Sequence, residues 1–188
     1  FYFDYLSNIN SYLIVIFSSF ISGVFFFLLG KRYKNEINIY EQIFLVFSIY
    51  FVLSLFILIP FYLGEYNFTF IDSYFESISG LTGTGFTIFE NIKYLDPPIV
   101  LWRSSSQWVG GLYFLIFLVL VFSNKQLNFK SLDFTFNLEK KINFSPNLLN
   151  VTNKIFLIYL ILSIIIFLIF LLSGIRLFDS LNLTMTII

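Results

Sequence analysis

The stretch that decides the fold reads DSYFESISGLTGTGFT and covers residues 72–87. Its first ten residues are semi-apolar and predict a helix over 72–81, with Asp72 at its start and the spacing of a capping box from Ser73 to Glu76. Such a helix is about 15 Å long, half the hydrocarbon thickness of a bilayer. Three glycines then prevent the helix from continuing. The stretch therefore predicts a short helix followed by an irregular, glycine-rich segment.

Four long stretches without a charged residue surround this segment. They are Tyr5–Gly30, Gln42–Gly64, Ser104–Asn124 and Ile155–Ile175. Each is long enough to cross a bilayer, which takes roughly 20 apolar residues in a helix. Only 12% of the 188 residues are charged, against about 25% in soluble domains, so polar surface could not cover four such helices. We therefore predict an all-α integral membrane protein with four crossings.

The distribution of Lys and Arg predicts the orientation, because these residues gather on the cytoplasmic side. Three follow the first apolar stretch and five lie between the third and fourth: Lys31, Arg32, Lys34, Lys125, Lys130, Lys140, Lys141 and Lys154. The connection 65–97 holds only Lys93 and is expected to face outward. A short helix and a glycine-rich segment in an outer connection are typical of a re-entrant pore loop. Backbone of this kind is tolerated at membrane depth where protein buries it or where it lines water.

The chemistry is expected to lie in Thr82, Gly83, Thr84 and Gly85. A dehydrated cation needs oxygen atoms in place of its water shell, and backbone carbonyls supply them when successive ones point to one axis. This requires positive φ at some positions, which glycine adopts at low cost. Threonine hydroxyls add oxygen without fixed charge, and the preceding helix directs its negative end at the ion path. We predict a selectivity filter for a monovalent cation at these four residues.

Two motifs in this chain resemble the TrkH/KtrB superfamily of potassium uptake proteins. The run Phe75–Phe86 is similar to the first pore loop of that family, and Leu101–Ser104 with Gln107–Gly111 is similar to the start of the helix that follows it. The resemblance implies helix–pore loop–helix repeats as in potassium channels, with potassium as the transported ion and no cofactor. It makes Gly85 the key filter glycine. The family commonly has Thr or another residue where this chain has Gly83. This departure is expected to loosen the segment and to weaken strict selectivity for potassium.

The same resemblance divides the chain into four parts. Residues 1–40 form an N-terminal transmembrane helix and a basic cytoplasmic loop, 41–124 the first complete repeat, 125–153 a cytoplasmic connection, and 154–188 the start of a second repeat. The echo of Ile71–Tyr74 in Phe178–Leu181, 107 residues later, supports the second repeat. With that offset Ile188 corresponds to Leu81, so the chain is expected to be an N-terminal fragment that stops before its second filter.

Four residues near the loop have expected supporting roles. Glu76 lies on the short helix, where capping would explain it, and Arg103 is expected to pair with a carboxylate of the loop and brace the filter. Arg103 could instead extend toward lipid head groups. Gly110 and Gly111 are expected to permit close helix contact. On this interpretation Gly110→Ala would leave ion discrimination intact even if it lowered the rate.

Composition narrows the class of function. The chain has no His and no Cys and a net charge of zero, which argues against thiolate metal sites and a nucleic-acid partner. The alternatives are a membrane enzyme or lipid-handling protein whose re-entrant loop binds a head group, and a structural helix bundle. The family resemblance implies location in the bacterial inner membrane, a homodimer within the lipid bilayer, and a cytoplasmic nucleotide-binding regulatory subunit similar to TrkA.

Overall fold

The computed structural model describes residues 9–31, 39–64, 66–90, 95–122 and 146–188. Within these ranges the chain is all-helical. The helices are α1 (Ile9–Gly30), α2 (Ile39–Tyr62), α3 (Phe70–Thr82), α4 (Pro97–Phe122), α5 (Pro146–Leu172) and α6 (Leu177–Ile187). The all-α prediction is thus confirmed for the described part of the chain.

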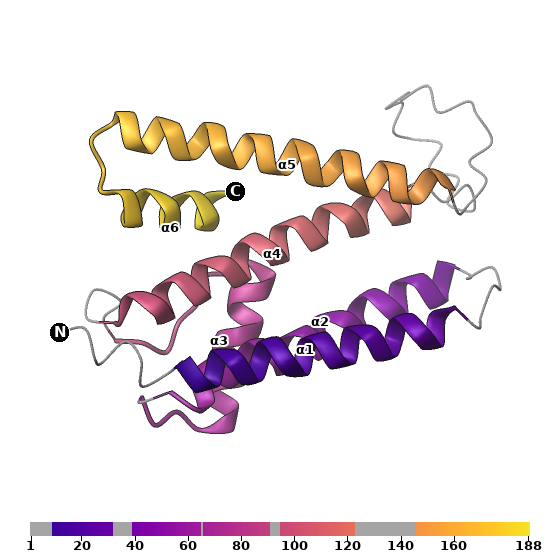
Figure 1. Ribbon diagram of the computed structural model, residues 1–188, viewed down its shortest axis with the longest axis horizontal. Coiled ribbons are helices and arrows are strands. Elements are labelled where there is room, and N and C mark those ends of the chain that lie inside the picture. The colour runs from indigo at the N-terminus through magenta and orange to yellow at the C-terminus, as the bar shows by residue number, and fades with distance from the viewer. Residues whose placement is uncertain (1–8, 32–38, 65, 91–94, 123–145) are drawn as a thin grey trace.

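Helix α4 runs through the middle of the molecule (Figure 1). The pair α1 and α2 lies on one side of it, and the pair α5 and α6 lies on the other. The short helix α3 packs against both α2 and α4, while α6 packs against α4 and α5. Both short helices therefore pack against α4: α3 precedes it in the chain and α6 follows it.

Three helices of the described chain are long and apolar enough to cross a membrane, namely Ile9–Gly30, Tyr40–Tyr62 and Asn150–Leu172. The fourth predicted crossing, 104–124, falls mainly on α4, which has 26 residues. Its N-terminal half carries Arg103 and the polar run Ser104–Gln107, so it does not meet the same criterion of apolarity over the described residues. Three of the four predicted crossings are supported by helix length and composition.

The short helix α3 begins two residues earlier than the sequence predicts. Its N-cap is Thr69, whose hydroxyl accepts from the backbone N–H of Asp72, while the Asp72 carboxylate accepts from the Thr69 N–H at 3.2 Å. The predicted capping box from Ser73 to Glu76 is therefore wrong. Ser73 lies inside the helix and donates to the Thr69 carbonyl at 3.0 Å. Glu76 is left without a capping role, and its side chain faces another part of the fold.

The two segments with similar sequence, Ile71–Tyr74 and Phe178–Leu181, both lie at the start of a short helix that follows a long one. Each long helix, α2 and α5, is followed within a few residues by a short helix that carries aspartate in its first turn, Asp72 in α3 and Asp179 in α6. The α5–α6 turn contains Gly174 at φ 80°. By contrast, α6 has Arg176 at its N-cap without a side-chain capping bond. The two hairpins share their architecture and differ in how the short helix starts.

An aromatic cluster fixes the far end of the glycine-rich segment. Phe61 of α2, Ile99 of α4 and Phe89 of the connection before α4 are buried together, and Phe68 packs edge-on against Phe89 with 4.9 Å between ring centroids. Trp102 adds a bond from its Nε1 to the Ile57 carbonyl at 3.0 Å. Because Phe89 packs in this cluster, the far end of the segment is anchored to α2 and to the start of α4.

The orientation can be tested with two cysteines. Glu90→Cys and Lys130→Cys are expected to react with a membrane-impermeant maleimide from opposite sides, with position 90 labelled in intact cells and position 130 only after permeabilisation. Position 130 and most of the basic residues lie outside the described ranges, so the prediction rests on their sequence alone. Labelling of both positions in intact cells would contradict the re-entrant loop.

Candidate functional site

The chain leaves helix α3 at the residues that the sequence predicts to bind an ion. Gly83 is the C-cap of α3 with φ 67° and donates its N–H to the Gly80 carbonyl at 3.1 Å. Gly85 also has positive φ, at 77°. A Cβ on either glycine would meet nothing within 4 Å, so the backbone conformation and not space excludes other residues. The glycine pattern thus corresponds to two left-handed positions separated by one residue.

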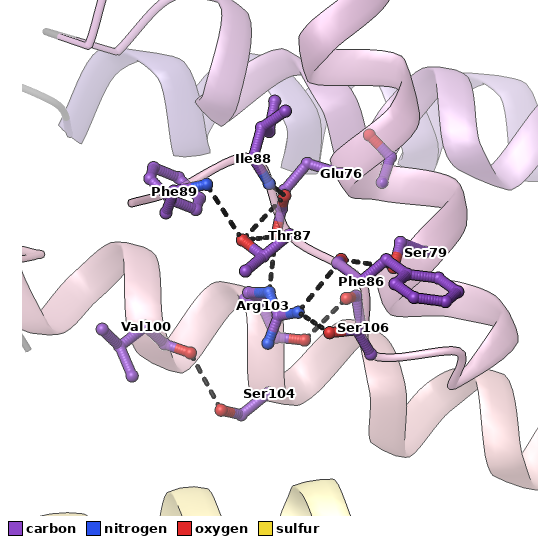
Figure 2. A network of polar contacts seen from close by, with 12 residues as sticks. Glu76, Ser79, Phe86, Thr87, Ile88, Phe89, Val100, Arg103, Ser104 and Ser106 are labelled. Atoms are coloured by element: carbon purple, nitrogen blue, oxygen red, sulfur yellow. Dashed lines mark hydrogen bonds and ion pairs between the residues drawn. The ribbon is translucent and has the colours of Figure 1, made fainter. Parts of the chain in front are cut away.

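A buried ion pair lies directly behind this segment (Figure 2). Glu76 of α3 is completely buried, and its Oε1 accepts from the Nε of Arg103 on α4. Arg103 is itself only 8% exposed. A buried charge is tolerated when it is paired and hydrogen-bonded, and both conditions hold here. The two charges neutralise each other, so the pair adds no net charge beside the loop.

Both partners of the ion pair also hold the loop backbone. The Nη2 of Arg103 donates to the carbonyls of Gly85 and Phe86, at 3.2 and 3.4 Å. The Glu76 carboxylate accepts from the Ile88 N–H and the Thr87 hydroxyl, each at 3.1 Å. Four consecutive residues, 85–88, are therefore bound to one carboxylate and one guanidinium. This network determines where the segment can run (Figure 2).

Side-chain hydroxyl groups connect the segment back to its own helix. Ser79 donates to the Phe86 carbonyl at 2.5 Å, and the Thr84 hydroxyl lies 3.1 Å from the Ser79 hydroxyl. Thr82 donates to the Ile78 carbonyl at 2.7 Å. A hydroxyl that donates still has lone pairs, and a carbonyl oxygen with one bond has a second acceptor position. The Thr84 hydroxyl thus takes part in the network and still has capacity to accept, while the Gly85 carbonyl is directed at Arg103.

The structure brings the predicted residues into one site. Thr82, Gly83, Thr84 and Gly85 are exposed on one segment, and Glu76 and Arg103 stand behind it. Sequence reasoning missed Ser79 and Thr87, and also Ser106 of α4, whose hydroxyl donates to the Arg103 carbonyl at 2.7 Å. For Ser106 the sequence does offer a signal of proximity to the site, because it lies three residues after Arg103 on α4 and hence on the same helix face. Among the described residues no group of three or more His, Cys, Asp or Glu side chains could hold a metal ion. The oxygen atoms available as ligands at this site belong to backbone carbonyl and side-chain hydroxyl groups.

Known proteins similar to this chain are membrane transport proteins. An uncharacterized cation transporter, MJ1485, of Methanocaldococcus jannaschii is 34% identical over 128 residues, which cover 68% of this chain and 27% of that protein. The Trk system potassium uptake protein TrkG of Escherichia coli is 25% identical over 88% of this chain and 36% of its own length. TrkH of Salmonella typhimurium is 33% identical over 49% of this chain and 19% of its length. No family model and no solved structure matches the chain.

The described helices that are long and apolar enough to cross a membrane, together with these relatives, place the chain in a class of membrane proteins whose named members are transporters and not enzymes. Within this class, the chain belongs to the TrkH/KtrB superfamily, as the two sequence motifs indicate. It spans between 19% and 36% of the length of the three relatives described above.

Proposed function

We propose that this chain contributes one ion-coordinating loop to a pathway for monovalent cations, with potassium as the preferred ion and sodium as the second candidate. The observation that supports this most strongly is the segment 82–85, which has two positive-φ glycines and whose last residue, Gly85, is bound by Arg103 of a buried ion pair. Successive carbonyls on such a backbone can face one axis, and no formal charge on the segment repels a cation. TrkG and TrkH are named as potassium uptake proteins, which favours potassium.

Helix α3 contributes electrostatically to the proposed filter. Its C-terminal carbonyls carry the negative end of the helix dipole, equivalent to roughly half an elementary charge, and the segment 82–85 begins at that end. Its first turn carries Asp72 at the positive end, which stabilises the helix in this direction. A cation beside Thr82 and Gly83 would therefore meet a partial negative charge and oxygen ligands at the same place.

The main alternative, a re-entrant loop that binds a lipid head group, fits the geometry less well. A phosphate would require an accessible cationic side chain, and among the described residues Arg103 is the cationic one that contacts the loop. This guanidinium is buried and already bound to Glu76 and to two backbone carbonyls. Releasing it for a phosphate would break the network that fixes the segment.

The whole-protein architecture is part of the same proposal. Residues 41–124 form the first helix–pore loop–helix repeat and 154–188 begin the second, with further repeats needed to surround the ion. The fourth crossing is α4, whose polar half lies against α3. The complete transporter is proposed to work as a homodimer in the bacterial inner membrane with a cytoplasmic nucleotide-binding subunit similar to TrkA.

Uptake measurements test the function directly. The complete transporter is expected to restore growth on low potassium to cells that lack other potassium uptake systems, and to take up rubidium in competition with potassium more strongly than with sodium. Expression in the membrane without either effect would contradict the proposal. Equal competition by sodium and potassium would retain the cation pathway and refute the preference for potassium.

A further inference from the structure

Helices α3 and α4 touch where the glycine-rich segment begins. A Cβ added to Gly110 of α4 would lie 1.7 Å from the Leu81 carbonyl oxygen and 2.6 Å from its carbonyl carbon. These are backbone atoms, so no side-chain rotation could relieve the overlap. Leu81 is 1% exposed and is followed directly by Thr82. The absence of a side chain at Gly110 is thus a condition for the observed position of Leu81.

Three residues on one face of α4 approach α3 and its loop closely. Arg103, Ser106 and Gly110 follow each other at three and four residues, the spacing of one helix face. The first contacts Glu76, and a Cβ on Gly80 would lie 2.4 Å from the Ser106 hydroxyl oxygen. Close approach therefore extends over two turns of α4. It includes Gly110, which lies against Leu81, the last residue before the proposed filter.

We propose that Gly110 is a positioning residue for ion discrimination, because it sets the position of the Leu81 carbonyl from which the segment 82–85 departs. The inference rests on the proposed function of that segment. It reverses the expectation from the sequence that Gly110→Ala would leave discrimination intact. An added methyl group must push α3 and α4 apart by more than an ångström. A coordination site tolerates a displacement of only about 0.5 Å.

The neighbouring glycine provides a matched control on the same helix. A Cβ on Gly111 would meet the Tyr159 hydroxyl at 2.7 Å, and the next atoms, Tyr159 Cζ and the Ile188 carbonyl oxygen, lie at 3.7 and 3.8 Å. The atom that a Cβ on Gly111 would overlap is the hydroxyl oxygen of Tyr159 on α5, and Tyr159→Phe removes this atom. Gly23 on α1 has nothing within 4 Å of such a Cβ and controls for the substitution alone.

The experiment compares potassium and sodium competition against rubidium uptake in the complete transporter. Gly110→Ala is expected to lower the ratio of sodium to potassium inhibition constants roughly tenfold, equivalent to about 1.4 kcal/mol. Gly111→Ala with Tyr159→Phe, and Gly23→Ala, are expected to keep the wild-type ratio. A purely structural role would lower the amount of transporter in the membrane and leave the ratio unchanged, which would overturn the proposal.

A second pair of variants decides the question if Gly110→Ala does not accumulate. Gly80→Ala is expected to lower the ratio partially, and Ser106→Ala in the same chain to restore it, since the obstacle is then removed and the next atom is 3.6 Å away. No change with Gly80→Ala would overturn the proposal. If Gly85→Ser changes the ratio while Gly110→Ala and Gly80→Ala do not, the positioning role fails and the filter stands. If none of them changes it, the proposed function itself fails.

Discussion

Glu76→Ala is expected to destabilise the protein by about 3–5 kcal/mol, because it leaves the Arg103 guanidinium buried without its counter-ion. The carboxylate also accepts from the Ile88 N–H and the Thr87 hydroxyl, which would lose their acceptor. The measurement is the fraction of monodisperse transporter that remains after heating in detergent. Glu90→Gln, on an exposed carboxylate of the same connection, is the control and is expected to change stability by about 0.5 kcal/mol or less.

A double variant separates stability from ion selectivity. Glu76→Leu with Arg103→Met replaces the ion pair by apolar side chains, a change that is often neutral for stability. It also removes the donor to the carbonyls of Gly85 and Phe86. We therefore expect thermal stability to recover most of the loss seen with Glu76→Ala, apart from the bonds that Glu76 accepts from the Ile88 N–H and the Thr87 hydroxyl, while discrimination between potassium and sodium remains impaired. Recovery of both properties would show that the pair only stabilises the fold and does not brace the loop.

Gly85→Ser is expected to reduce discrimination between potassium and sodium about tenfold while the protein still inserts in the membrane. With φ at 77°, a residue with a Cβ pays roughly 1–2 kcal/mol in this conformation or leaves it. Leaving it would rotate the Gly85 carbonyl and break its bond from Arg103. Rubidium uptake with competing sodium, in cells without other uptake systems, measures the effect.

Gly174→Ser is the matched control for this prediction. Gly174 has φ 80°, and a Cβ there would also meet nothing within 4 Å, so the strain is the same. It lies in the turn between α5 and α6, away from the segment 82–85. The variant is expected to lose a similar amount of stability and to keep wild-type discrimination. If Gly85→Ser behaved in the same way at normal expression, the segment would not be the filter.

Local sequence patterns were sufficient for much of the architecture. Apolar stretches of about 20 residues form long helices regardless of what they pack against, because every backbone polar group is satisfied within the helix. The glycines at 80–85 end α3 and supply two left-handed positions, a property of the backbone itself. The two motifs that carry the family resemblance are local as well, because each lies within a short stretch of the chain.

The start of α3 shows where local patterns were insufficient. Two capping boxes compete, one from Thr69 and one from Ser73, and both have suitable spacing. The choice of Thr69 places Glu76 in the middle of α3, where it is buried against α4. The capping residues alone do not distinguish the two boxes, because both have the required spacing.

Two functional assignments depended entirely on the crossing of α3 and α4. The sequence by itself determined that a short helix and a glycine-rich segment interrupt a series of membrane helices, because helix length and backbone freedom are local properties. Only the tertiary structure decided that Glu76 binds Arg103, 27 residues away, and that Gly110 contacts Leu81. Both contacts join residues from different helices, and their geometry follows from how closely the two helices approach, which no local pattern specifies.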